Sequence, residues 1–225
     1  MKLTERDVRL VRDVALSGVL CRSQVVRLGY FSSVSRANRR LRALCGEGML
    51  KPVDTPFHAR RLYVPGLAAV SVLGDEVARL VSHRSGTPRF LQHALAVTEL
   101  RIGLADADRK WRFEGQARHR FAFGKREHDL RPDGLLLSES GAMFVEADLG
   151  HVSLPRFARR FEGYRAYFGG GSFASVYGSR KHRILVVTTG ELRRSHVSKA
   201  AKDAGVDADV TTFAALGIPV LGGWS

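Results

Sequence analysis

Three carboxylates near the middle of the chain are the residues whose types and spacing could do chemistry: Asp133, Glu146 and Asp148. Side chains alternate between the two faces of a β-strand, so Glu146 and Asp148 share one face of the strand expected at residues 142–148. Asp133 lies in the preceding strand of a hairpin with a Ser-Gly turn, which brings it close to them. Acidic groups gathered in this way repel one another unless a cation or a basic side chain balances them.

Two kinds of partner could balance this acidic hairpin. One is a bound cation, and Glu114, at the end of the strand expected at 111–114, is then the best fourth carboxylate. The other is a set of ion pairs, because buried carboxylates can be satisfied by arginine without any metal. The arginines nearest in the sequence are Arg131, Arg159 and Arg160. The residues alone leave both interpretations open.

An α/β domain is predicted around this hairpin. Residues 183–189 form a continuous apolar run, as expected for a strand in the buried middle of a sheet. Helices on both sides of a central mixed sheet make the predicted fold class α/β (α+β). The expected helices are 89–106, 154–168 and 191–204, and the expected strands are 111–114, 121–137, 142–148, 183–189 and 209–213.

Three short helices followed by a β-hairpin are predicted at the start of the chain. Thr4 can cap the first helix, and Asp7 three residues later makes an acidic variant of the capping box. The helices are expected at about 4–17, 23–28 and 35–45, and the strands at 49–53 and 61–64. This is the layout of a winged helix, in which the third helix enters the major groove of DNA and the wing touches the backbone.

The third helix carries a dense basic pattern. Apolar residues recur at helical spacing and are expected to face the core: Val34, Ala37, Leu41 and Leu44. The opposite face and the wing hold the candidate DNA-binding residues Arg36, Asn38, Arg39, Arg40, Arg42, His58, Arg60 and Arg61. Arginine can pair with guanine edges or phosphates, and asparagine can read adenine. The alternatives are a charged solvent-exposed face and a protein-interaction module.

The net charge favours a polyanionic partner. The 225 residues include 36 Lys and Arg against 22 Asp and Glu, a formal net charge of +14. Residues 1–65 alone hold 13 of the basic and 5 of the acidic residues, a concentrated excess typical of a nucleic-acid-binding module. No run approaches ~18 apolar residues, so no membrane span is expected. The charged, helix-like N-terminus argues against a signal peptide.

A domain boundary is predicted near residue 86. The stretch at 83–88 contains Gly86 and Pro88 and is the best linker candidate. It separates a winged-helix domain at 1–85, which ends in a mostly apolar helix at 66–83, from an α/β domain at 86–225. Cys21 and Cys45 offer no zinc spacing and are expected to be free, buried thiols.

The second domain resembles the core of the PD-(D/E)XK nuclease superfamily. The matching pieces are R-P-D-G, which holds Asp133, and F-V-E-A-D, which holds Glu146 and Asp148. The resemblance implies that Asp133 and Glu146 bind Mg²⁺, which would activate water for phosphodiester cleavage; Glu114 stays the candidate additional ligand from its place in the sequence. The superfamily has a Lys at the position of Asp148, which puts catalysis in doubt. Arg160 is the candidate replacement on the following helix, but arginine stays protonated and is a poorer general base.

The whole chain resembles the replication-relaxation family of plasmids and integrative elements over about residues 4–189. The pieces that carry this resemblance are T-E-R-D, R-R-L-R-A-L-x-x-E-G-M-L, R-L-Y-V, L-Q-H-A-L-A-V, R-P-D-G and F-V-E-A-D-L-G, followed by a Tyr on the helix. The resemblance implies DNA binding linked to the replication or transfer of a mobile element.

Two functions of different classes follow from this resemblance. One is a non-catalytic DNA-binding regulator or accessory factor with a degenerate nuclease-like domain. The other is a Mg²⁺-dependent endonuclease that is targeted by its winged helix. Asp148 in place of the usual Lys favours the first. The expected partners are double-stranded DNA, replication or transfer proteins of the element and a second copy of the chain, with no membrane. The expected location is the bacterial cytoplasm, at the nucleoid or a plasmid.

Overall fold

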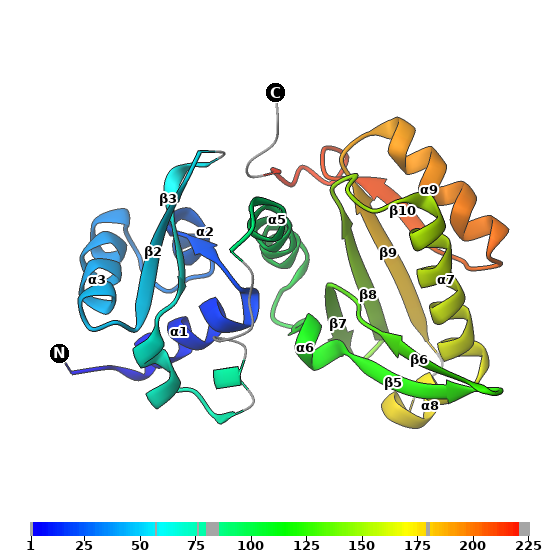
Figure 1. Ribbon diagram of the computed structural model, residues 1–225, viewed down its shortest axis with the longest axis horizontal. Helices are drawn as coiled ribbons and strands as arrows, with labels where there is room; N and C mark the ends of the chain where they lie inside the picture. The colour runs from blue at the N-terminus through cyan, green and yellow to red at the C-terminus, as the bar shows by residue number, and fades with distance from the viewer. Residues whose placement is uncertain (1, 57, 76, 80–85, 179–180, 221–225) are drawn as a thin grey trace. The chain divides into compact units, whose positions relative to one another are not determined.

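The structure is a computed structural model that describes residues 2–56, 58–75, 77–79, 86–178 and 181–220 (Figure 1). The side chains of Ala59 and Arg60 also lie outside the described part. The chain divides into two compact units: Met1–Ile102 with Val220–Ser225, and Gly103–Pro219. Helices and strands occur in both, so the fold class is mixed α/β, as the sequence predicts.

The first unit begins with three helices and a small antiparallel sheet. The helices are α1 (Glu5–Ser17), α2 (Arg22–Arg27) and α3 (Val34–Gly46), and the strands are β1 (Leu20–Cys21), β2 (Leu50–Thr55) and β3 (His58–Pro65). The sheet order is β1-β3-β2, with both pairs antiparallel. The capping box predicted at the start of α1 is confirmed, since Thr4 and Asp7 cap each other's backbone amides. The three helices and the hairpin thus come in the predicted order.

Two predictions in this unit are wrong. Val34 is 49% exposed instead of facing the core, because helical side chains tilt toward the N-terminus and Val34 is the first residue of α3. The helix expected at 66–83 is not continuous, since a 3₁₀ helix, η1 (Leu67–Ser71), is followed by non-helical residues up to Gly74. Glycine is a poor helix former, which explains the break. Residues 80–83 of that prediction lie outside the described residues.

The helix α5 (Pro88–Leu104) completes the core of the first unit. Its buried side chains Leu91, Ala94 and Leu95 pack with residues of β1 and β3, among them Cys21 and Leu62. The two cysteines are free thiols, as predicted, but only Cys21 is buried as expected, since Cys45 is partly exposed. None of the helices among the described residues is both long enough and apolar enough to cross a bilayer.

The second unit is built on a five-stranded mixed sheet with the order β10-β9-β8-β7-β4. The strands are β4 (Lys110–Phe113), β7 (Gly134–Ser138), β8 (Gly141–Asp148), β9 (His182–Thr188) and β10 (Asp209–Thr212). Strands β8, β9 and β10 are parallel, and β7 runs antiparallel to β4 and β8. The continuous apolar run predicted as a central strand is β9, with Ile184, Val186 and Val187 almost fully buried.

Two helices cover one face of this sheet (Figure 1). They are α7 (Leu154–Gly169) and α9 (Glu191–Asp203), and the short α8 (Ser172–Tyr177) lies between α7 and β9 in the sequence. Phe144 and Val186 from the sheet pack with Tyr164 of α7 and with Val197 of α9. The side chains at 144, 146 and 148 alternate with those at 145 and 147, so the acidic residues of β8 lie on the face that these helices cover.

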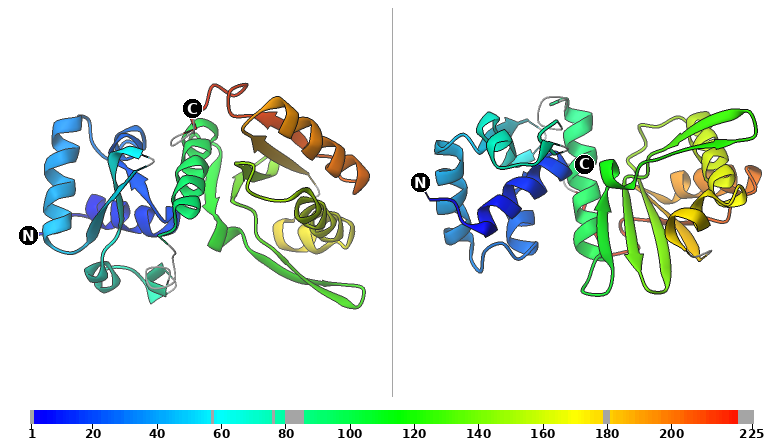
Figure 2. Two further views of the ribbon diagram at one scale, coloured as in Figure 1. Left: turned by 45° about the horizontal axis from the view of Figure 1, so that its top comes forward. Right: turned by 90° about the horizontal axis from the view of Figure 1, so that it is seen from below.

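The strand expected at 121–137 is three strands. Within the part of the chain that the structure describes, strands β5 (His119–Phe123) and β6 (Arg126–Leu130) pair only with each other, as a ribbon that lies beside α7 (Figures 1 and 2). Gly124 forms the turn of the ribbon with a φ of 61°, a conformation that suits glycine. Pro132 has no amide to donate to a ladder, which ends the pairing before β7 begins. The helix α6 (Glu114–Ala117) separates β4 from the ribbon.

Candidate functional site

The acidic hairpin is formed as the sequence predicts. Gly134 pairs with Val145 in the β7–β8 ladder, so Asp133, just before β7, comes next to Glu146. Its Oδ2 accepts a hydrogen bond from the backbone amide of Ala147 at 2.8 Å. All three carboxylates are buried, with Glu146 and Asp148 at most 1% exposed and Asp133 at 9%. A side chain at position 134 would collide with the Trp111 ring, so glycine there leaves room for this ring of β4.

Glu146 is held by two donors from α7. The Arg160 guanidinium donates to Oε2, and the Tyr164 hydroxyl donates to Oε1 at 2.7 Å. The charge of Glu146 raises the pKa of Arg160 above its usual value. Burial, and then the charge of Glu146, raise the pKa of Tyr164. Arg160 is therefore a permanent cation and Tyr164 a permanent hydrogen-bond donor at ordinary pH.

Asp148 is held by an arginine that the sequence analysis missed. Arg193 of α9 donates from Nε to Oδ2 at 2.5 Å and from Nη2 to Oδ1 at 3.2 Å. Its Nη2 also donates to the Val152 carbonyl at 2.5 Å, and the Gly150 amide donates to Asp148 Oδ1 at 3.0 Å. Arg193 lies 45 residues after Asp148, and no local pattern predicts a pair over that separation.

The other residues predicted near the hairpin lie elsewhere. Arg131 pairs with Asp129 rather than Asp133. Arg159 is exposed on α7. Glu114 is exposed at the first position of α6 instead of ending a strand. The structure thus brings Asp133, Glu146, Asp148 and Arg160 together and leaves Glu114 at the surface.

These carboxylates do not fit a divalent ion in this arrangement. Mg²⁺ needs free oxygen ligands in near-octahedral geometry, whereas both oxygens of Glu146 and of Asp148 accept hydrogen bonds from protein donors. Over the ranges that the structure describes, no three His, Cys, Asp or Glu side chains are grouped as metal ligands. Metal binding would first require Arg160 or Arg193 to leave its carboxylate.

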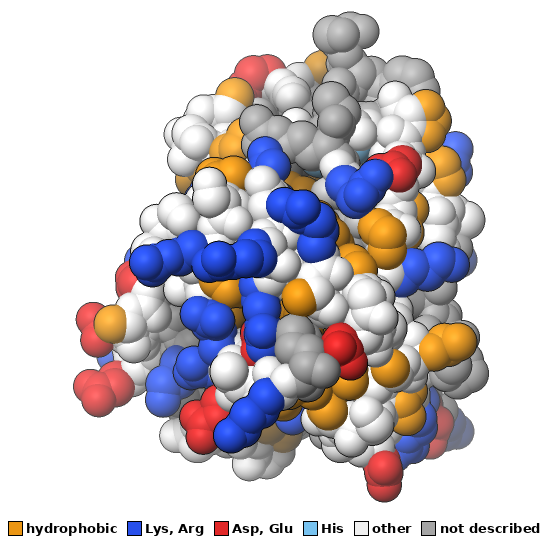
Figure 3. Space-filling view, turned by 90° about the vertical axis from the view of Figure 1, so that its left-hand side faces the viewer, with side chains coloured by type: hydrophobic (Ala, Val, Ile, Leu, Met, Phe, Trp, Pro, Cys, Tyr) orange, Lys and Arg blue, Asp and Glu red, His pale blue; other side chains and the backbone are white. Residues whose placement is uncertain are grey.

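The exposed face of α3 carries three arginines in a row. Arg36, Arg39 and Arg42 are exposed at successive intervals of three residues, while Ala37 and Leu41 are fully buried on the opposite face. Residues three apart on a helix are neighbours on its surface. Figure 3 shows the face of the first unit at the left of Figure 1, where α3 lies, and Lys and Arg side chains gather on it.

Two other predicted DNA contacts on α3 are engaged within the unit. Asn38 Oδ1 accepts a hydrogen bond from Arg22 Nη1 at 3.1 Å. Arg40 donates to both oxygens of the fully buried Asp7, with Nε to Oδ1 at 2.8 Å. Asn38 and Arg40 therefore have structural contacts within the unit, and Arg40 ties α3 to α1. The exposed row of Arg36, Arg39 and Arg42 is the part of α3 that faces outward.

The predicted wing is the β2–β3 hairpin, in which Thr55 pairs with His58. Arg61 forms an exposed ion pair with Asp54, with 3.2 Å between Nε and Oδ1. His58 is half-buried, and the side chain of Arg60 lies outside the described residues.

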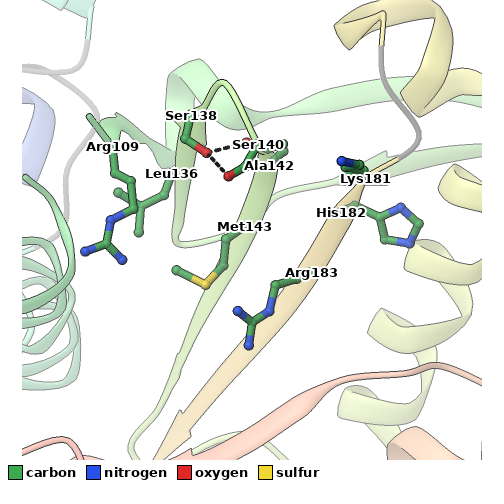
Figure 4. A pocket seen from close by; sticks show the side chains of 10 residues that line it. Arg109, Leu136, Ser138, Ser140, Ala142, Met143, Lys181, His182 and Arg183 are labelled. Carbon is green, nitrogen blue, oxygen red and sulfur yellow. Dashed lines mark hydrogen bonds between the residues drawn. The ribbon is translucent and has the colours of Figure 1, made fainter.

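Figure 4 shows a hollow that the sequence analysis did not identify, beside the turn between β7 and β8. Arg109, Lys181 and Arg183 line it, and both arginines have carboxylate partners. Arg109 Nε donates to Asp106 at 2.9 Å, and Arg183 Nη2 donates to Asp209 at 2.6 Å. Neutralised cations attract an anion less than unpaired ones, so this hollow is the weaker candidate for binding phosphate.

Comparisons with known proteins give one family and one solved structure. The family model described as replication-relaxation matches residues 11–182. The crystal structure of protein VC1899 from Vibrio cholerae is similar with 11% identity and a TM-score of 0.38. That likeness covers 96% of this chain but only 55% of VC1899. A search of curated proteins finds no match.

Proposed function

Because the chain belongs to the replication-relaxation family, we propose that it is a DNA-binding protein of a plasmid or integrative element that acts in replication, transfer or their regulation. Family membership indicates a role in the replication of plasmids or mobile elements. The first unit is the DNA-binding part, as a winged helix whose α3 enters the major groove. Replication or transfer proteins of the element and a second copy of the chain are its proposed protein partners.

The row of arginines on α3 is the observation that carries this proposal. Arg36, Arg39 and Arg42 point away from the core on a helix whose other face is anchored by Leu41 and Leu44. Among the described residues, Arg39 has no ion-pair partner, so its guanidinium is available to a phosphate or a guanine edge. Lys51, at the start of the wing, is likewise exposed.

The second unit acts, in this proposal, as a non-catalytic nuclease-like domain. Arginines neutralise Glu146 and Asp148 from two different helices. An arginine does not take up the proton of an attacking water, because it stays protonated. This arrangement supports a domain whose acidic residues hold α7 and α9 onto the sheet.

The alternative is a Mg²⁺-dependent endonuclease, and one observation favours it. Asp133 and Glu146 lie next to each other across the β7–β8 hairpin, as the nuclease resemblance requires. In an active enzyme these two carboxylates would bind the ion once Arg160 had moved to a substrate phosphate. The two candidate functions predict different effects of Mg²⁺ on the melting temperature of the protein.

The DNA-binding proposal is tested by removing two arginines of the α3 row. Arg39→Ala with Arg42→Ala should weaken duplex binding at least ~10-fold at fixed salt, because each side chain contributes a phosphate or base contact. Fluorescence anisotropy with a labelled duplex measures the dissociation constant. The matched control, Arg12→Ala with Arg89→Ala, removes the same charge from exposed positions outside α3. An unchanged dissociation constant in the α3 variant, or an equal loss in the control, would rule out α3 as the reader.

A further inference from the structure

A second basic surface lies on the second unit, between the β5–β6 ribbon and α7. It is a hollow of about 440 Å³. We call it the arginine hollow. The polar residues that line it are His128, Asp129, Arg131, Arg156, Arg159 and Arg160. Four guanidinium groups thus face one carboxylate across an open surface. None of these residues belongs to the α3 row or to the wing.

The cations of the arginine hollow differ in how they are held. Arg156 and Arg159 are exposed, and neither has an ion-pair partner in the part of the chain that the structure describes. Arg131 is half-exposed and is positioned by Asp129. Arg160 is fixed by Glu146 behind it. The hollow therefore combines two positioned guanidinium groups with two that are free to bind an anion.

The positive surface continues from the hollow along the ribbon. A neighbouring depression shares His128, Asp129 and Arg131 with the arginine hollow. Arg118, which shares Asp129 with Arg131, lines this depression together with Arg120 and Glu127, and Lys125 and Arg126 are exposed at the ribbon turn. Cations therefore extend over two elements instead of converging on one point. A linear polyanion fits this spread better than a single small phosphate does.

We propose that the arginine hollow binds the phosphodiester backbone of DNA, as a contact surface separate from α3. The proposal rests on the proposed function in one respect, namely that the ligand is DNA. Arg156 and Arg159 lie three residues apart on α7 and are neighbours on its surface, as the α3 arginines are. Guanidinium forks match phosphate oxygens in geometry and retain their charge at any ordinary pH. The ion pair with Arg160 keeps Glu146 from repelling a bound phosphate.

The test uses the full chain with Arg156→Ala and Arg159→Ala. Both side chains are exposed and unpaired among the described residues, so the melting temperature should not change. Binding is measured by anisotropy on a duplex and on a single strand of equal length, over a series of salt concentrations. We expect at least ~5-fold weaker binding to one or both DNAs. The slope of the logarithm of the binding constant against the logarithm of the salt concentration should also become smaller by about 1 to 2, because each lost phosphate contact lowers this slope by about 0.7 to 0.9.

Two further variants show whether the effect belongs to this surface. Arg156→Lys with Arg159→Lys keeps the charge and should retain most of the binding. Lys110→Ala with Lys202→Ala removes two exposed charges outside the hollow and should change little. A loss on the single strand alone identifies the ligand as unpaired DNA, and a loss on both identifies the backbone in general. Wild-type affinity on both DNAs, or an equal loss in the Lys110/Lys202 control, overturns the proposal.

Combining the variants of the arginine hollow and of α3 distinguishes their contributions to DNA binding. Contributions of independent sites add, so the hollow variant should weaken binding by the same factor in wild type and in Arg39→Ala/Arg42→Ala. If the α3 variant binds normally while the hollow variant does not, the α3 proposal fails and the hollow stands. If only the α3 variant loses binding, the hollow proposal fails alone.

Discussion

Four buried carboxylates in this protein are each held by one arginine from another element. The pairs are Asp7 with Arg40, Glu99 with Arg27, Glu146 with Arg160 and Asp148 with Arg193. Each carboxylate is at most 1% exposed. Removing the arginine of such a pair leaves the carboxylate buried without a counter-charge, which costs about 3–5 kcal/mol. These four arginines therefore have a structural role, unlike the exposed arginines of α3 and unlike Arg156 and Arg159 in the arginine hollow, which Arg160 also lines.

The response of Glu146 to metal separates a structural acidic hairpin from an active one. We expect Mg²⁺ to leave the melting temperature of the wild type unchanged, because Arg160 and Tyr164 occupy both carboxylate oxygens. Glu146→Gln should lower the free energy of unfolding by about 1–3 kcal/mol, since it leaves the arginine without its charged partner. Thermal melting with and without Mg²⁺ gives both quantities.

The endonuclease alternative predicts the opposite pattern. A ligand that binds only the folded state raises its stability, so Mg²⁺ would raise the melting temperature of the wild type and not of Glu146→Gln. Mg²⁺-dependent cleavage of a plasmid by wild type, lost in Asp133→Asn, would establish that alternative.

The buried carboxylate of Asp7 makes stability depend on pH. Burial alone would raise its pKa, but hydrogen bonds from Arg40 and Thr4 outweigh burial and lower the pKa from 3.8 to about 2. A carboxyl group with a depressed folded-state pKa stabilises the protein above the unfolded value, and this stability is lost as pH falls toward the folded value. Asp7 should therefore contribute about 2 kcal/mol at neutral pH that disappears between about pH 4 and pH 2.

Asp7→Asn tests this contribution. The variant should be less stable than wild type at pH 7, and the difference should shrink as pH falls from 4 to 2. Urea denaturation followed by circular dichroism at each pH measures the difference. Asp207→Asn, which removes an exposed carboxylate, serves as the control. A difference between Asp7→Asn and wild type that is constant with pH would contradict the role assigned to the carboxylate charge.

Local spacing predicts some of these residues and not others. The alternation of a strand places Glu146 and Asp148 on one face, and the capping-box spacing pairs Thr4 with Asp7. Arg160 was a candidate because it follows the hairpin closely. Arg193 could not be predicted, because its contact with Asp148 depends on how α9 packs on the sheet.

At the scale of elements, the ribbon β5–β6 shows where apolar and polar patterns mislead. The apolar residues at both ends of 121–137 suggest one strand, whereas Gly124 and Pro132 mark the interruptions that divide it. The two-residue β1 is too short to leave a periodic signal. Long elements with a clear period, such as α3, α7 and β9, were predicted to within a few residues. The ribbon is nevertheless what places Arg131 beside α7.

The contacts of α5 bear on how the chain can be divided. The predicted boundary near residue 86 stays a prediction, and the compact units divide after Ile102. Within the first unit, Glu99 of α5 accepts hydrogen bonds from Gln24 at 3.0 Å and from Arg27 at 2.5 Å. Leu95, which is fully buried, packs in the same core.

Two fragments would show where the first folding unit ends. A fragment of residues 1–102 should melt cooperatively and bind duplex DNA. A fragment that ends at Ser85 should bind more weakly and melt at a lower temperature, because it lacks the apolar side chains and Glu99 that α5 supplies. Circular dichroism and anisotropy on both fragments measure these differences. Equal melting temperatures would show that α5 adds nothing to the first core.

At the scale of the whole molecule, the range matched by the family model covers both of the basic surfaces described above. The matched residues 11–182 include α3 and the arginine hollow, so the family model spans parts of both units. The concentration of basic residues in the first 65 positions was visible from composition alone. The positive surface on the second unit was not, because it arises from arginines on a ribbon and a helix that lie apart in the sequence.

The close contact between Gly134 and the Trp111 ring gives the second unit its own optical probe. The chain has two tryptophans, Trp111 and Trp224, and residues 1–102 contain none. After Trp224→Phe, emission on excitation at the indole band would come from Trp111 alone. Its wavelength and quantum yield would then report the state of the β4–β7 edge, next to Asp133, while the first unit stays spectroscopically silent. Unfolding of the two units could thus be followed separately in the intact chain without a label.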